Sequence, residues 1–161
     1  EVRHIAPALL GAAARLAKQN PDLRFVLPAM RGVRDLLDPM VAKFAGQFDL
    51  QVLDGRSHEA LAACDLTLIA SGTATLEAAL FKRPMVIAYA MPGFSYRLMA
   101  AKRHLPWIGL PNVLCAPRGW LHRPASAAPH RWADRPGAPL ATPELIQPPA
   151  TPDPLAPAVH A

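Results

Sequence analysis

A short run of small and hydroxylated residues, Ser71-Gly72-Thr73-Ala74-Thr75, is the segment of this chain best suited to chemistry. An apolar run at 66–70 leads into it, and Glu77 follows. The hydroxylated residues are good helix N-caps, the glycine allows close approach to the backbone, and free amides at a helix start favour a diphosphate. The Glu77 carboxylate could accept hydrogen bonds from ribose hydroxyls. Taken alone, the pattern favours an ordinary capped turn, with Glu77 serving the helix dipole, because short motifs often arise by chance.

Helical and strand patterns alternate through residues 1–115 and place this run at the end of a strand. The expected strands cover residues 25–27, 50–53, 65–70, 84–89 and 107–110. The expected helices cover residues 5–16, 33–44, 57–61, 73–81 and 94–103. This alternation predicts an α/β fold with a Rossmann-like parallel sheet and flanking helices. Ligands bind such sheets at the carboxyl ends of strands, which is where residues 71–77 should lie.

The composition changes near Cys115. Residues 1–115 hold eight prolines and the shorter segment 116–161 holds eleven, and proline at that density breaks helices and removes backbone donors. We therefore expect two parts: a folded lobe over residues 1–115, and an irregular Pro/Ala/Arg-rich tail over residues 116–161 that packs poorly.

Charge and cysteine content narrow the function classes. The net charge of +5 suits a nucleic acid, an anionic lipid or a phosphorylated substrate, or a generally basic surface, but no nucleic-acid motif accompanies it. No apolar run reaches the roughly 18 residues that a membrane span needs, and no signal-peptide pattern opens the sequence. The two cysteines, Cys64 and Cys115, form no ligand-spaced cluster, which predicts a reduced, cytoplasmic setting without a metal.

Three motifs together resemble one family, the lipid-A-disaccharide synthases. These motifs are SGTATLE at residues 71–77, the K-x-P-M-V pattern at residues 82–86, and Leu110-Pro111-Asn112. The similarity extends over essentially all of residues 1–115. After Cys115 the resemblance lapses through an Ala/Pro/Arg-rich stretch at 116–142, which looks inserted or read out of frame, and an echo of the family pattern returns at residues 143–147.

The resemblance implies one lobe of a two-lobed GT-B-type glycosyltransferase that needs no cofactor and no metal. The family transfers 2,3-diacylglucosamine from UDP-2,3-diacylglucosamine to 2,3-diacylglucosamine 1-phosphate with inversion, giving lipid A disaccharide and UDP. This chain matches the second, nucleotide-binding lobe, so the catalytic base is expected in the first lobe, and this fragment alone is expected to be inactive. The nucleotide-binding positions that the resemblance implies are Ser71, Gly72, Thr73, Ala74, Thr75, Glu77 and Asn112.

The family also implies work at the cytoplasmic face of the inner membrane of a Gram-negative bacterium. A peripheral contact with anionic lipid is expected from a basic and apolar cluster, namely Phe94, Arg97, Met99, Lys102, Arg103 and His104. One departure weakens the expected anion site, since Ala90 stands where the family usually carries a basic residue. Two alternatives remain: another nucleotide-sugar enzyme of the same fold, such as an epimerase, and a non-catalytic nucleotide-binding remnant.

Overall fold

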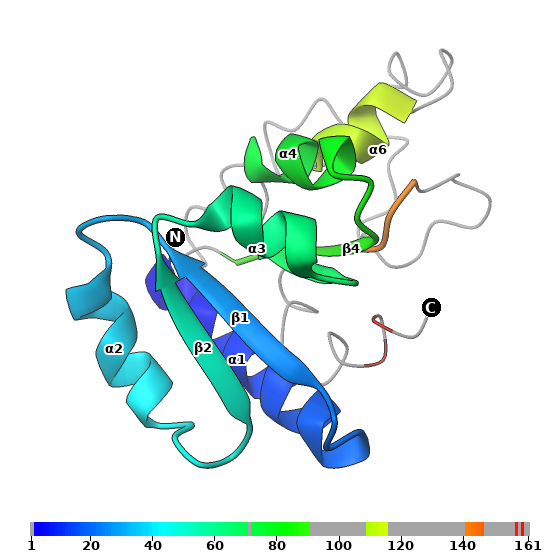
Figure 1. Ribbon diagram of the computed structural model, residues 1–161. Coiled ribbons are helices and arrows are strands. Elements are labelled where there is room, and N and C mark those ends of the chain that lie inside the picture. The colour runs from blue at the N-terminus through cyan, green and yellow to red at the C-terminus, as the bar shows by residue number, and fades with distance from the viewer. Residues whose placement is uncertain are drawn as a thin grey trace.

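The computed structural model describes residues 2–70, 72–90, 109–115 and 141–146, together with positions 157 and 159. Helices and strands alternate along it, as Figure 1 shows. In chain order they are α1 (Val2–Gln19), β1 (Arg24–Ala29), α2 (Arg34–Ala42), β2 (Asp49–Asp54), α3 (Ser57–Ala63), β3 (Thr67–Ala70), α4 (Ala74–Leu80), β4 (Met85–Tyr89), α6 (Leu110–Cys115) and β5 (Glu144–Ile146). The expected α/β class is thus confirmed.

All strand pairs in the described ranges are parallel, as the crossover helices require. They form two sheets where we expected one: β1 pairs with β2, and β3, β4 and β5 form a three-stranded sheet with β4 in the centre. No hydrogen-bonded pairing joins β1 to β3 among these strands, and α3 packs against β1. The sequence pattern predicted β1 to β4 and their parallel direction, but neither β5 nor this division into two sheets.

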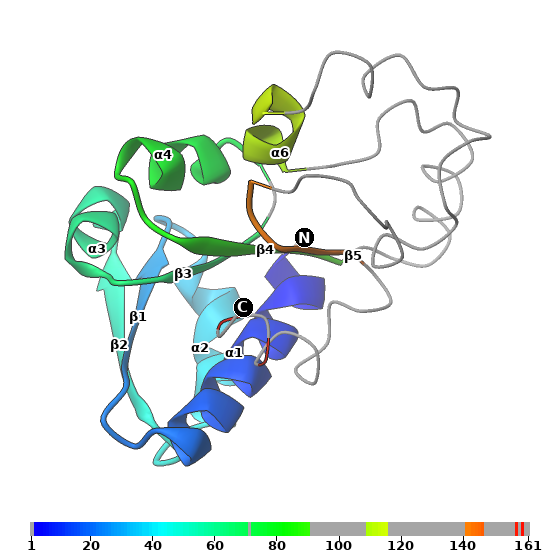
Figure 2. The ribbon, with the colours of Figure 1, turned by 90° about the vertical axis from the view of Figure 1, so that its right-hand side faces the viewer.

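Strand β4 has both faces buried, because successive side chains point to opposite sides of a sheet. Val86 and Ala88 pack against α1, while Met85 and Ile87 pack against α3 and α4. Full burial of an aliphatic side chain such as Ile87 stabilises the fold by about 1.5–3 kcal/mol. Figure 2 shows the resulting layers, with α1 on one side of this sheet and α4 and α6 on the other.

Helix α1 packs against both sheets. Ile5, Ala8 and Ala12 contact the three-stranded sheet, and Ala6 packs with Ala29 of β1 and with α2. Alanine is a strong helix former, and its small side chain lets neighbouring elements come close. The helix begins earlier than the expected residue 5, at Val2, so Pro7 lies inside it rather than in its first turn, where it leaves the carbonyl four residues earlier without its usual amide donor.

Part of the proline-rich tail belongs to the sheet. Glu144, Leu145 and Ile146 pair in parallel with Ile87, Ala88 and Tyr89 of β4. This segment can form a strand because its proline, Pro143, lies just before it, where no ladder donor is needed. The carbonyl of Pro143 instead accepts a hydrogen bond of 2.9 Å from the Ile87 amide.

Two further elements, a helix and a strand, were expected after β4. The helix expected at 94–103 lies outside the described residues, as do positions 107 and 108 of the expected last strand. The prediction of a strand is wrong at Leu110, where α6 begins. Pro111 stands in the first turn of α6, a position that suits proline, so the Leu-Pro-Asn motif opens a helix.

Candidate functional site

Six of the seven candidate site residues fall at positions 71–77, which comprise the link between β3 and α4 and the first turn of α4 and are called the β3–α4 loop below. Ser71 lies outside the described part of the chain. Gly72 has a φ of +134°, a conformation that residues with a side chain rarely adopt, and a Cβ placed on it would meet no atom within 4 Å. The backbone at Gly72 therefore faces open space, and a ligand could approach it closely.

The two threonines of this loop have different surroundings. Thr75 is fully buried, and its hydroxyl donates a 2.7 Å hydrogen bond to the carbonyl oxygen of Gly72. Thr73 is exposed at the N-cap of α4 and makes no side-chain capping bond. Thr75 thus holds the loop in shape, whereas the hydroxyl of Thr73 is available to a ligand.

The backbone amides of this segment also fall into two groups, those that donate within the protein and those that do not. The amides of Thr75, Leu76 and Glu77 donate to the carbonyls of Gly72 and Thr73. Among the described residues, the amides of Thr73 and Ala74 donate to no acceptor of the protein. Donors left over at a helix start are suited to the oxygens of an anionic group.

Glu77 has a partner that sequence reasoning missed. Its Oε2 lies 3.2 Å from Nε2 of His58, which comes from α3, and both side chains are partly solvent-exposed. The sequence gives His58 no role, because nothing local links two residues that are 19 positions apart. The available signal was topological: α3 and α4 flank successive strands and cover the same face of the β3–β4–β5 sheet.

Arg83 fixes the placement of α3 beside α4. Its guanidinium donates to the carbonyls of Leu61 and Ala62 at the end of α3, with a distance of 2.9 Å to Leu61. These are carbonyls that a helix end leaves without intrahelical donors. Arg83 also belongs to the turn that closes α4, where its amide donates to Ala78 and the amide of Lys82 donates to Ala79. This is a Schellman motif with Lys82 in the left-handed conformation, at φ +55°.

Asn112, the last predicted site residue, lies in a buried polar cluster at α6. Its Nδ2 donates to the carbonyl of Thr142 at 3.0 Å and to Oε2 of Glu144 at 2.8 Å, and its Oδ1 accepts from the Thr142 amide at 3.0 Å. The side chain is fully buried, so both amide hydrogens are used within the protein. Asn112 therefore connects α6 to the segment before and within β5, and its role in nucleotide binding stays a prediction.

The same cluster explains the neighbouring glycine. A Cβ on Gly109 would lie 2.5 Å from Cδ1 of Ile87 and 3.1 Å from Oε2 of Glu144. Thr142 adds a hydrogen bond from its hydroxyl to the carbonyl of Met85. Close packing at Gly109 and these hydrogen bonds together hold β5 beside β4.

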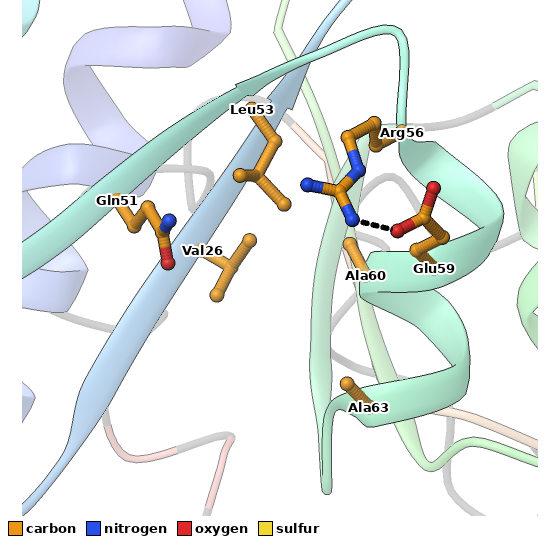
Figure 3. Close-up of a pocket in the computed structure, with 7 residues that line it drawn as sticks. All are labelled: Val26, Gln51, Leu53, Arg56, Glu59, Ala60 and Ala63. Atoms are coloured by element: carbon orange, nitrogen blue, oxygen red, sulfur yellow. Dashed lines mark hydrogen bonds and ion pairs between the residues drawn. The ribbon is translucent and has the colours of Figure 1, made fainter.

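A separate cavity lies on the opposite side of α3. It has a volume of about 250 Å³ and is drawn in Figure 3. Its lining comes from β1, β2 and the start and outer face of α3, namely Val26, Gln51, Leu53, Arg56, Glu59, Ala60 and Ala63. The hydrogen bond and charge of Glu59 raise the pKa of the Arg56 guanidinium, and the hydrogen bond from Arg56 lowers the pKa of the Glu59 carboxyl. None of the predicted site residues lines this cavity.

Helix α3 therefore has two faces with different neighbours. His58 and Leu61, three residues apart, face α4, while Arg56, Glu59, Ala60 and Ala63 face β1 and β2.

Among the described residues, no three His, Cys, Asp or Glu side chains gather in a way that could hold a metal ion. No helix in the described ranges is long and apolar enough to cross a membrane. The expected membrane-contact cluster from Phe94 to His104 lies outside those ranges.

Comparison with known proteins gives one consistent family. A family model described as Lipid-A-disaccharide synthetase matches residues 1–118. A lipid-A-disaccharide synthase of Albidiferax ferrireducens is 50% identical over 115 residues, covering 71% of this chain and 30% of that protein. Those of Thiobacillus denitrificans and Pseudomonas aeruginosa are each 44% identical, covering 97% of this chain and 36% and 35% of theirs. The chain thus spans about a third of the length of these relatives. The matches support neither an epimerase nor a non-catalytic remnant.

Proposed function

The chain belongs to the lipid-A-disaccharide synthetase family, and we propose that it is the nucleotide-binding lobe of a two-lobed glycosyltransferase of lipid A biosynthesis. The observation that carries this proposal is the family match over residues 1–118, which includes the whole β3–α4 loop. The complete enzyme would transfer 2,3-diacylglucosamine from its UDP derivative to 2,3-diacylglucosamine 1-phosphate. The products would be lipid A disaccharide and UDP.

In this proposal the β3–α4 loop binds the UDP group. The diphosphate would lie against the open backbone at Gly72, with the hydroxyl of Thr73 and the amides of Thr73 and Ala74 as donors. The ribose hydroxyls would donate to Glu77, whose side chain is 42% exposed. Donors fixed before the reaction would also stabilise the negative charge on the departing UDP.

The acceptor hydroxyl and the base that deprotonates it belong, in this proposal, to the other lobe. Positioning and acid–base catalysis each contribute about 10²-fold or more in rate. We therefore expect the 161-residue chain to form no disaccharide from the two acylated sugars. A peripheral contact with anionic lipid at the inner membrane completes the proposal, in keeping with the acylated substrates.

Thermal protection by UDP tests the nucleotide site. A ligand that binds only the folded state stabilises it by about 2.7 kcal/mol at a hundred times its Kd, so UDP should raise the melting temperature of the chain. Gly72→Val should abolish this shift, because a β-branched side chain fills the space the diphosphate needs.

Gly46→Val is the matched control for this substitution. Gly46 also has a positive φ, +75°, and open space at its Cβ, but it lies in the turn between α2 and β2. Both variants should suffer backbone strain, and more at the φ of +134° than at +75°, so each variant is compared with its own melting temperature without UDP; only Gly72→Val should lose the response to UDP. An unchanged UDP shift in Gly72→Val would place the nucleotide elsewhere, and no shift in the unaltered chain would reject the proposed site.

A further inference from the structure

We propose that His58 is a positioning residue for nucleotide binding, which fixes the Glu77 carboxylate in the orientation that receives the ribose hydroxyls. This inference rests on the proposed function, because it takes the loop that begins α4 to be the nucleotide site. The two side chains meet across α3 and α4, with His58 Nε2 3.2 Å from Glu77 Oε2.

The contact occupies one side of the carboxylate and leaves the other open. An ionised carboxylate can accept about four hydrogen bonds through two oxygens, and the imidazole N–H uses one of them, on Oε2. No hydrogen bond from the described residues is made to Oε1 of Glu77. A ribose diol could therefore bind while the contact with His58 remains in place.

The imidazole has one further ring contact, and the helix that carries it is held beside α4. Its ring lies 5.7 Å, centroid to centroid, from the ring of Phe81, at an interplanar angle of 44°. The helix that carries it is tied to the end of α4 by the bonds from Arg83 to Leu61 and Ala62. The His58 side chain is 70% exposed, so its position depends on this ring contact and on the placement of α3, and from there it restricts a glutamate that would otherwise sample several rotamers on a helix surface.

The expected size of the effect follows from the entropy of ordering one side chain. Immobilising a flexible side chain on binding costs about two- to tenfold in affinity, and the contact with His58 removes that cost beforehand. The gain should appear only with ligands that use Glu77. A ligand without ribose hydroxyls should not benefit.

The test measures the Kd of UDP and of 2′,3′-dideoxy-UDP by calorimetry, using the 161-residue chain. His58→Ala should weaken UDP binding by about two- to tenfold and leave dideoxy-UDP binding unchanged. His58→Gln should restore UDP binding, because the glutamine amide can present a donor where Nε2 stood. His4→Ala, an exposed histidine on α1 beyond the sheet, is the matched control and should behave like the unaltered chain.

A double-mutant cycle completes the test. In a Glu77→Gln background the further change His58→Ala should have no additional effect on UDP binding, since the carboxylate that it positions is gone. UDP binding that is indifferent to His58→Ala would overturn the inference, and so would equal weakening of both nucleotides. Failure of the unaltered chain to bind either nucleotide would instead reject the nucleotide site itself, and the inference with it.

Discussion

Replacing Asn112 with alanine should destabilise the fold strongly, because the side chain joins two segments 30 residues apart in sequence. The change removes three hydrogen bonds from a fully buried position: two donated by Nδ2 and one accepted by Oδ1. A buried polar group that loses its partner costs about 1–3 kcal/mol. Since Thr142 loses partners on both its amide and its carbonyl, and some water entry will offset part of the loss, we expect about 2–5 kcal/mol.

Urea unfolding followed by far-ultraviolet circular dichroism measures this loss. Asn112→Asp should be at least as destabilising at neutral pH, because it keeps the acceptor for the Thr142 amide but sets a second carboxylate against Glu144. Asn20→Ala is a control, since the Asn20 side chain accepts one exposed hydrogen bond, from the Asp22 amide at 3.1 Å. That control should cost less than about 1 kcal/mol.

The outcome separates two roles for Asn112. If the free energy of unfolding of Asn112→Ala lies within about 0.5 kcal/mol of that of the unaltered chain, the buried hydrogen bonds of Asn112 do not stabilise the fold as we infer. If the same variant also fails to bind UDP, Asn112 belongs to the nucleotide site, as the sequence motif predicts. A large loss of stability supports the role of joining α6 to β5.

Two smaller predictions concern the ends of helices. Lys82→Gly should raise the unfolding free energy by about 1 kcal/mol, measured by urea unfolding, because the left-handed position of a Schellman motif strains any residue with a Cβ; a loss of stability would contradict this. Glu59→Gln should lower the melting temperature at pH 7 but not in acid. The pKa of Glu59 is lowered in the folded state by Arg56, so its contribution is present above the ordinary value of 4.5 and is lost as the pH falls through the folded value. A gap in melting temperature that persists well below pH 4.5 would refute the role given to this ion pair.

Local patterns were enough to predict most elements of the lobe. The apolar runs at 25–27, 50–53 and 84–89 fall within or around β1, β2 and β4. The turn at Gly55 ends β2 as its sequence indicates, but β1 continues through Pro28 to Ala29, so proline did not mark the end of that strand. The amphipathic runs at 5–16 and 33–44 likewise mark α1 and α2. Each of these signals is contained in a few neighbouring residues.

The features that were missed depend on contacts between distant segments. β5 is only three residues long and lies beside prolines. It forms a strand because it pairs with the free edge of β4. The contact of His58 with Glu77 requires the relative placement of two helices, which no local spacing records. The burial of Asn112 depends on Thr142 in the same way. The family motifs drew attention to the loop. Only the structure shows that Thr75 is buried and bonded to Gly72 while the hydroxyl of Thr73 is exposed.

The use of α1 by both sheets has a consequence for the order of events during synthesis. One of its faces is covered early, because β1 and Leu37 follow within a few tens of residues. The other face waits for Val86 and Ala88, about 80 residues after Ile5. At about 5–20 residues per second this interval lasts about 4–16 s, during which an apolar stripe of a growing chain stays exposed. The helix that packs against both sheets of the folded lobe is therefore open to aggregation while the chain is still being synthesised.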